Sequence, residues 1–221
     1  RSVTEDVAGL SIPGVVAYPA GDRFGPGLGE EAVVARARES GPLRLLFLGN
    51  LIPRKNLHVL LDGLATVRAP WTLSVIGGAP EPAYAERVRR QADRLGMTER
   101  VNWRGAVSDA EVRAALLEHQ ALVVPSSYEG FGIVYVEALR FGLPVLATTA
   151  GAAPEVVGHD SEGALVPPND PAAIARVIEG WANDRERLAA LGLNALARAQ
   201  KFPTWEQTGQ TIRDYLLAFM I

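Results

Sequence analysis

Two adjacent cations stand where a helical pattern begins. Residues 49–56 read GNLIPRKN, with Arg54 and Lys55 directly before a stripe of apolar residues at helical spacing. Free backbone N–H groups and the positive end of the helix dipole favour a bound phosphate at such a start. The run is close to a Walker A loop, but Asn56 replaces the hydroxyl residue that binds magnesium. The alternative interpretation is two solvated basic residues on a surface helix.

A second candidate region is the loop at residues 125–132, which precedes another helical stretch. Gly130 and Gly132 flank Phe131 in this loop. Glycine has no Cβ and permits sharp turns that gather N–H groups into a concave nest, which suits an anion. The serines of the loop lack the G-x-S-x-G pattern of a hydrolase, so they are not predicted to be nucleophiles.

Two acids accompany this loop. Glu129 precedes the glycines, and Glu137 lies two turns into the following helix among apolar residues. An ionised carboxylate can accept two hydroxyl hydrogens at once, so each acid suits a diol of a sugar or ribose. The alternative is a turn acid and a partly buried acid paired with Arg140. A glycosidase pair requires two carboxyls about 5–10 Å apart across the scissile bond, and nothing in the sequence assigns that role.

These loops must be positioned by the surrounding elements. Short apolar runs alternate with helical stretches, and none shows the apolar–polar alternation of a half-exposed sheet. Strands are predicted at 43–48, 71–76, 101–104, 121–124, 145–148 and 163–166, and a further short strand at 15–18. The alternation predicts an α/β fold with a doubly wound parallel sheet, in which ligands bind beyond the carboxyl ends of the strands.

The segments between the predicted strands have sequence patterns that predict helices. Ser108 with Glu111, and Thr204 with Gln207, have the spacing of capping boxes that open helices. Helices are predicted at 30–40, 55–67, 82–95, 108–119, 133–141, 172–183, 185–201 and 204–221. Both candidate loops therefore follow strands directly.

Composition excludes several classes of protein. The chain has 221 residues, 48% hydrophobic and 21% charged, which is typical of a soluble globular protein. Its net charge of −3 does not favour nucleic-acid binding. The absence of cysteine excludes disulfides and cysteine nucleophiles. The three histidines are far apart, so no metal site is predicted.

In this order the motifs resemble the C-terminal half of a retaining, GT-B-fold glycosyltransferase of group 1, often called GT4. The matching segments are 18–24, 47–56, 101–105, 129–137 with its E-x7-E spacing, 151–157 and 163–170. The resemblance covers nearly the whole chain. It implies a Rossmann-like, doubly wound parallel sheet, the C-terminal half of a GT-B fold that binds a nucleotide-diphosphate-sugar donor.

The resemblance also implies a role for individual residues. Lys55 would meet the diphosphate, Glu129 the donor-sugar hydroxyls, and Glu137 the ribose diol. Family members commonly have an arginine where this chain has Asn50, and Arg54 is the candidate replacement. The implied donor-binding residues are Asn50, Arg54, Lys55, Val107, Asp109, Glu129, Gly130, Phe131, Gly132, Ile133 and Glu137, with Glu129 and Lys55 catalytic and no metal ligand.

As an enzyme, such a protein would transfer a hexose with retention and without a metal or other cofactor. The donor would be a UDP, GDP or ADP sugar. The acceptor, a lipid, glycan or small molecule, would bind a preceding domain that this chain lacks, so we expect donor binding with little or no transfer.

We expect a cytoplasmic protein, with peripheral membrane association through the other domain as an alternative. A non-catalytic nucleotide-sugar-binding or regulatory module and a GT-B sugar-nucleotide epimerase remain as alternative functions.

The implied domain organisation has three parts. Residues 1–41 would be a remnant of the preceding domain and the hinge, 42–203 the nucleotide-sugar-binding domain, and 204–221 a helix that packs back on the preceding domain. This helix carries an apolar stripe of Ile212, Tyr215, Leu216, Phe219 and Met220. Without its partner the stripe should be exposed or covered by self-association, with a dimer or a disordered tail as the result.

Overall fold

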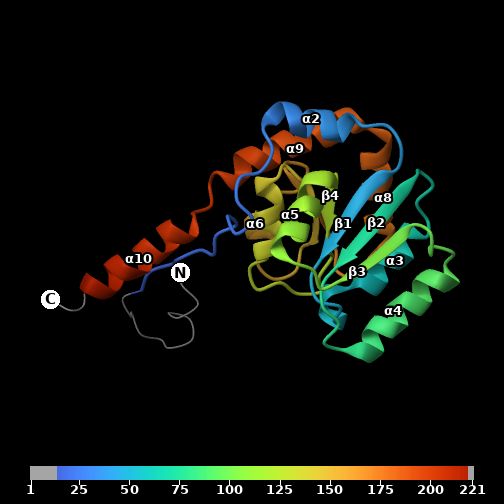
Figure 1. Cartoon of the computed structure of the whole chain (residues 1–221), viewed down its shortest axis with the longest axis horizontal. Coiled ribbons are helices and arrows are strands. Elements are labelled where there is room, and N and C mark those ends of the chain that lie inside the picture. Colours follow the sequence, from blue (N-terminus) through green and yellow to red (C-terminus); the bar gives the residue numbers. More distant parts are fainter. Residues whose placement is uncertain (1–13, 219–221) are drawn as a thin grey trace.

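Six parallel strands form one sheet in the order β3-β2-β1-β4-β5-β6 (Figure 1). The computed structural model describes residues 14–218. The strands are β1 (Leu43–Leu48), β2 (Trp71–Ile76), β3 (Val101–Gly105), β4 (Ala121–Val123), β5 (Val145–Thr148) and β6 (Gly163–Val166). The strands predicted from residue 43 onward are confirmed, and each begins at the predicted residue. The chain winds outward in both directions from β1 and β4, which confirms the doubly wound sheet.

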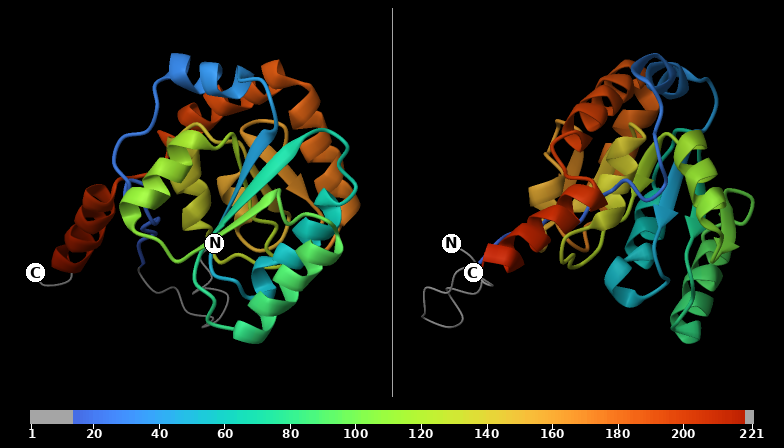
Figure 2. Two further views of the ribbon diagram at one scale, coloured as in Figure 1. Left: turned by 45° about the vertical axis from the view of Figure 1, so that its right-hand side comes forward. Right: turned by 60° about the vertical axis from the view of Figure 1, so that its left-hand side comes forward.

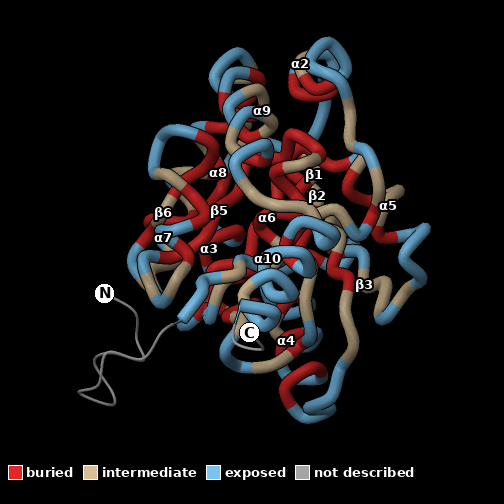
Figure 3. The backbone as a smooth tube through the Cα atoms, turned by 90° about the vertical axis from the view of Figure 1, so that its left-hand side faces the viewer, coloured by how far each residue is buried: buried red, intermediate tan, exposed pale blue. Residues whose placement is uncertain are grey.

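The sheet is buried because helices cover both of its faces (Figure 2). The helical elements are α2 (Glu30–Arg38), the 3-10 turn η1 (Pro53–Lys55), α3 (Leu57–Leu64), α4 (Pro82–Arg94), α5 (Asp109–Glu118), α6 (Ile133–Arg140), α7 (Ala153–Val156), α8 (Pro171–Asn183), α9 (Arg185–Ala199) and α10 (Trp205–Ala218). Every residue of β4 and β5 is buried, so these strands show no alternation. Buried residues concentrate along the strands and the inner helix faces (Figure 3).

Three local expectations need correction. Residues 15–18 form no strand and pair with none of the six described strands; the carbonyl of Tyr18 instead accepts from the Thr208 hydroxyl at 2.8 Å. The helix predicted at 55–67 is divided, because Asn56 adopts a left-handed conformation (φ 53°) between η1 and α3. The short helix α7 was not predicted.

Both predicted capping boxes are present. Ser108 accepts from the Glu111 N–H, and the Glu111 carboxylate accepts from the Ser108 N–H at 2.9 Å. Thr204 and Gln207 exchange the corresponding bonds at 2.8 and 3.2 Å. The first box fixes the start of α5 and places Asp109 at its first position.

The segment before α2 runs closely along α6. A Cβ at Gly21 would lie 2.8 Å from the Val136 carbonyl carbon, and one at Gly27 would overlap the Arg140 carbonyl oxygen. Only glycine permits this approach. The segment is thereby fixed against the helix that carries Glu137, and it holds Arg23 close to the same end of the sheet.

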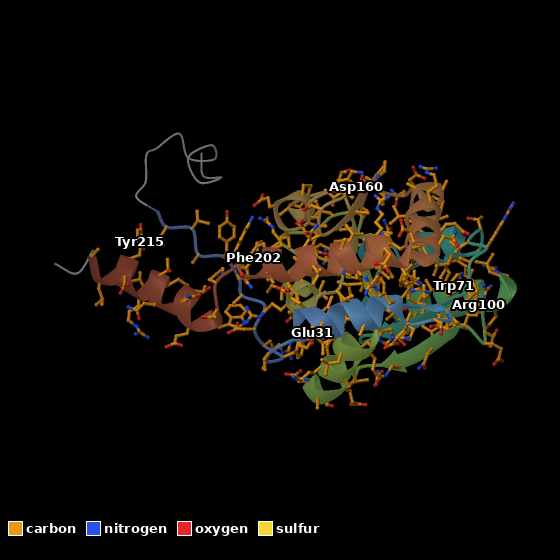
Figure 4. All side chains as sticks on the ribbon, turned by 90° about the horizontal axis from the view of Figure 1, so that it is seen from above. Glu31, Trp71, Arg100, Asp160, Phe202 and Tyr215 are labelled. Carbon is orange, nitrogen blue, oxygen red and sulfur yellow. The ribbon has the colours of Figure 1, made fainter. Side chains whose placement is uncertain are left out.

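Helix α10 projects from the body of the protein beside the N-terminal segment (Figure 1). Figure 4 shows Phe202 where this helix joins the body and Tyr215 far out along it. Ile212 and Leu216 are exposed, as expected for the stripe, whereas Tyr215 is half-buried. Residues 205–218 are helical, so a disordered tail is wrong for them; Phe219 and Met220 lie outside the described residues. Within residues 14–218, no helix combines the length and apolarity needed to cross a membrane.

A buried guanidinium joins three helices. Arg36 of α2 is 5% exposed and donates to the carbonyls of Leu116 and Leu117 at the end of α5 and of Phe141 and Gly142 at the end of α6. These carbonyls have few intrahelical partners, and helix C-termini attract cations. Burial lowers the pKa of Arg36 to about 10, which leaves it charged at neutral pH.

Replacement of Arg36 by methionine should destabilise the protein by roughly 3 kcal/mol, because four carbonyls, three of them buried, lose a charged donor. Arg38→Met is the matched control on the same helix: its ion pair with Glu186 is exposed to solvent, so its loss should cost much less stability than the loss of Arg36. Urea unfolding followed by circular dichroism measures both. Equal losses for the two variants would contradict the role of Arg36.

Candidate functional site

A cleft of about 820 Å³ opens beyond the carboxyl ends of the strands. Its walls come from the loops after β1, β2, β3 and β4, the first turns of α5 and α6, and the segment before α2. The loops after β1 and β4 diverge here because the two neighbouring strands lead to helices on opposite faces. This is the switch point at which open α/β sheets bind ligands.

Every residue that the sequence placed in the site lines this cleft. These are Asn50, Arg54, Lys55, Val107, Asp109, Glu129, Gly130, Phe131, Gly132, Ile133 and Glu137. The sequence reasoning missed Arg23 and Tyr128, which also line the cleft, and Ser126, which holds Glu129. Arg23 lies in the segment 18–24, which resembles a hinge motif. That resemblance was the available signal, but it did not indicate that Arg23 reaches the cleft.

The Lys55 ammonium and the Glu129 carboxylate form an ion pair at the centre of the cleft. Nζ of Lys55 lies 2.7 Å from Oε2 of Glu129, and the two side chains are only 12% and 10% exposed. Arg54 lies further out, with a guanidinium nitrogen 3.4 Å from Oε1 of Glu129 and 2.7 Å from the Tyr128 carbonyl oxygen. The cations after β1 and the acid after β4 thus form one charged cluster.

The Glu129 carboxyl is held ionised. Burial acts to raise its pKa, but the hydrogen bond and charge of Lys55, the Ser126 hydroxyl and the charge of Arg54 together hold the pKa below its ordinary value. The carboxylate is therefore available as an acceptor at neutral pH. Lys55 remains beside it as a cation for an anionic group.

Local backbone geometry positions the loop before α6. Gly132 has φ +89°, and a Cβ there would overlap the Tyr135 ring. Among residues 14–218, no carbonyl or side chain accepts from the N–H groups of Phe131, Gly132 or Ile133. These donors and the helix dipole form the nest that the sequence predicted.

The loops after β1 and β2 also pack against each other. Gly77 has φ +151°, and a Cβ there would overlap the Gly49 carbonyl oxygen. The amide oxygen of Asn50 lies 3.3 Å from the position of a Cβ at Gly78. The two loops are therefore in close contact, and together they form a wall of the cleft.

Glu137 is a buried carboxyl without a partner. It is 6% exposed, and no donor among the described residues reaches it. Burial raises its pKa to about 7; the charge of Arg23 opposes this shift and that of Asp109 adds to it. The interpretation of Glu137 as an acid paired with Arg140 is wrong.

An ion pair spans the mouth of the cleft. Arg23 donates to both carboxylate oxygens of Asp109 at 2.7 and 3.1 Å, and both side chains are mostly exposed. The pair connects the segment before α2 to the start of α5. In residues 14–218, no group of three or more histidine, aspartate or glutamate side chains is placed to hold a metal ion.

The parallel sheet, with a nest of N–H groups, two cations and two acids gathered at its switch point, defines a Rossmann-like α/β domain. The family model described as "Glycosyl transferases group 1" matches residues 30–198, and the chain belongs to this family. Its fold is that of the GT-B glycosyltransferases, as expected.

Curated relatives agree with this assignment. The chain is 35% identical to the D-inositol 3-phosphate glycosyltransferase of Streptomyces avermitilis, over 90% of this chain and 45% of the relative. It is 28% identical to the GDP-mannose-dependent alpha-(1-6)-phosphatidylinositol monomannoside mannosyltransferase of Mycobacterium tuberculosis, over 88% of this chain and 53% of the relative. The chain spans about half the length of the curated relatives it matches.

Solved structures show the same fold. HepE of Anabaena in complex with UDP-glucose has a TM-score of 0.76 and 27% identity over 87% of this chain and 56% of its own. The C-terminal domain of LpcC, a group 1 family glycosyl transferase of Francisella tularensis, has a TM-score of 0.70 and 21% identity. That structure is matched over 97% of its length and 83% of this chain.

Replacement of Glu137 by glutamine should remove a pH-dependent loss of stability. The carboxyl pKa rises from 4.5 to about 7 on folding, so the stability that the wild type has below pH 4.5 is lost as the pH rises through about 7. We expect Glu137→Gln to gain on the order of 3 kcal/mol relative to the wild type between pH 4.5 and pH 8.

Urea unfolding across this pH range measures the difference. The exposed Glu155→Gln is the control for the loss of one negative charge. A Glu137→Gln difference that stays constant with pH would contradict the raised pKa.

Proposed function

We propose that this chain is the donor-binding domain of a retaining glycosyltransferase that transfers a hexose from a nucleotide diphosphate sugar. The observation that carries the proposal is the meeting, in one cleft, of the Lys55–Glu129 ion pair and the unpartnered buried carboxyl of Glu137. Cations for phosphates and acceptors for hydroxyls are the groups that such a donor requires.

The diphosphate would bind at Lys55 and the nest before α6. Lys55 already contacts an anion, Glu129, at 2.7 Å, so an incoming phosphate can share the ammonium, which has three hydrogens to donate. Arg54 is close enough to add a second cation. The position of Asn50 offers an amide in place of a further charge.

The nucleoside and the sugar would occupy opposite sides of the diphosphate. Glu137 would accept from the two ribose hydroxyls, which would provide the donors that this carboxyl lacks. Val107 and Asp109 would lie beside the base. Glu129 and the free N–H groups of residues 131–133 would hold the donor sugar.

The chemistry assigned to these residues is stabilisation of a leaving group. As the bond between the sugar and the diphosphate breaks, negative charge grows on the departing oxygen. Lys55 and the N–H groups at the start of α6 are placed to stabilise that charge, which is the role that preorganised donors have in many active sites. We propose that this suffices without a divalent ion, and that Glu129 orients the sugar.

The relatives support a phosphorylated or lipid-linked acceptor. Their names include inositol phosphate and phosphatidylinositol mannoside. Since the chain spans about half of these relatives, we propose that residues up to 41 lead from a preceding acceptor-binding domain. Residues 42–203 would be the donor domain, and 204–221 would return to the preceding domain with its apolar stripe. The cytoplasm, with peripheral membrane contact through that domain, is the compartment we propose.

Calorimetric titration with UDP, GDP and ADP tests the donor site. HepE was solved with UDP-glucose and the mannosyltransferase uses GDP-mannose, so we expect one of these nucleotides to bind. Lys55→Ala and Glu137→Ala should each weaken that binding at least about tenfold, and EDTA should leave it unchanged. Lys201→Ala, an exposed lysine outside the cleft, is the control. Wild-type affinity for none of the three nucleotides would contradict the proposal.

Transfer should require the longer protein. We expect this chain to give no measurable turnover with UDP-glucose or GDP-mannose and an inositol phosphate acceptor. The longer protein should give a product in which NMR shows the anomeric configuration of the donor retained. Turnover by this chain alone would contradict the division of roles, and nucleotide-sugar binding without transfer by the longer protein would favour a regulatory module.

A further inference from the structure

The two carboxylate oxygens of Glu129 have different surroundings. Oε2 accepts from Lys55 Nζ at 2.7 Å and from the Ser126 hydroxyl at 3.0 Å. Among residues 14–218, Oε1 has a single donor, an Arg54 nitrogen at 3.4 Å, and the Arg54 side chain is 43% exposed. Each carboxylate oxygen has two lone pairs, so Oε2 is fully used and Oε1 retains capacity for a ligand hydroxyl.

Ser126 is itself rigidly placed. It is 1% exposed; its N–H donates to the Val124 carbonyl at 2.9 Å, and its own carbonyl accepts from the Thr148 hydroxyl at 2.6 Å. Thr148 is the last residue of β5 and is equally buried. The backbone that carries the Ser126 hydroxyl is therefore anchored to the ends of β4 and β5.

The backbone of Glu129 is fixed from the other side. Its carbonyl accepts from the Ala152 N–H at 2.8 Å, and a Cβ at Gly151, which has φ +65°, would overlap that same oxygen. With its backbone held by this turn, the side chain of Glu129 can still rotate about its own bonds. Lys55 has a long flexible side chain, so Ser126 is the rigid partner that selects one rotamer.

We propose that Ser126 is a positioning residue for sugar recognition: it holds Oε2 of Glu129 so that Oε1 is presented to a hydroxyl of the donor sugar. The inference rests on the proposed function of the cleft and deepens it. Ser126 does not line the cleft, so its contact with the site runs through the side chains that it holds, and Glu129 is the one of these that faces the cleft. Replacement of Ser126 should therefore weaken recognition of the donor sugar and leave the affinity for the nucleoside diphosphate nearly unchanged.

The experiment compares the affinities for a nucleoside diphosphate and for its sugar conjugate, with UDP and UDP-glucose, or GDP and GDP-mannose, as the probes. We expect Ser126→Ala to weaken binding of the conjugate about tenfold and to change binding of the free diphosphate less than about twofold. Ser127→Ala is the matched control, because the neighbouring hydroxyl contacts the Arg54 carbonyl at 3.3 Å and not Glu129.

A double-mutant cycle separates positioning from damage to the fold. Glu129→Gln alone should also lose the preference for the conjugate, and Ser126→Ala added to it should have no further effect. Additive effects of the two substitutions, an equal loss of both ligands in Ser126→Ala, or no change in that variant would each overturn the inference. If the wild-type chain binds none of the diphosphates, the proposed function fails, and the role of Ser126 fails with it.

Discussion

The ion pair between Lys55 and Glu129 connects the two loops that diverge at the switch point of the sheet. One partner follows β1 and the other follows β4, and both are nearly excluded from water. Burial of two charges costs free energy that the pair recovers only with good geometry and further hydrogen bonds. Ser126 and Arg54 supply those bonds. The pair leaves a cation and an acceptor together at the place where the fold binds ligands.

Two carboxyls in the same cleft are driven in opposite directions by their surroundings. Glu129 has donors on both oxygens, which hold its pKa down despite burial. Glu137 is buried and has no hydrogen-bond donor in the part of the chain that the structure describes, and burial raises its pKa to about 7. The first acid is ionised and already engaged, whereas the second is poised to gain from a ligand that brings hydroxyl donors. Environment, rather than residue type, thus separates their roles.

Close contacts fix the elements that carry the side chains of the cleft. Arg36 joins the ends of α5 and α6, whose first turns form part of the wall. Gly21 and Gly27 allow the segment before α2 to lie against α6, which brings Arg23 to Asp109. The segment before α2 is therefore in direct contact with the mouth of the cleft.

The sequence by itself determined the strands from residue 43 onward, most helix ends and many of the residues that line the cleft. Apolar runs bounded by glycine and proline mark strands buried on both faces, and capping boxes act within four residues, so both signals are local. Loops that follow parallel strands meet at one edge, which is why motifs around residues 50 and 130 could be placed together in advance. The expected strand at 15–18 failed because strand formation requires a neighbour, and local composition does not supply one.

Only the tertiary structure decided which side chains touch. The contact of Lys55 with Glu129 joins residues 74 positions apart, and that of Arg23 with Asp109 joins residues 86 apart. No local pattern encodes such pairs, since they depend on the stagger of loops and the rotamers that packing allows. The same holds for the lack of a partner at Glu137 and for the bond from Ser126 to Glu129. Periodicity sets where elements form, but the donors and acceptors of the site are assigned by three-dimensional packing.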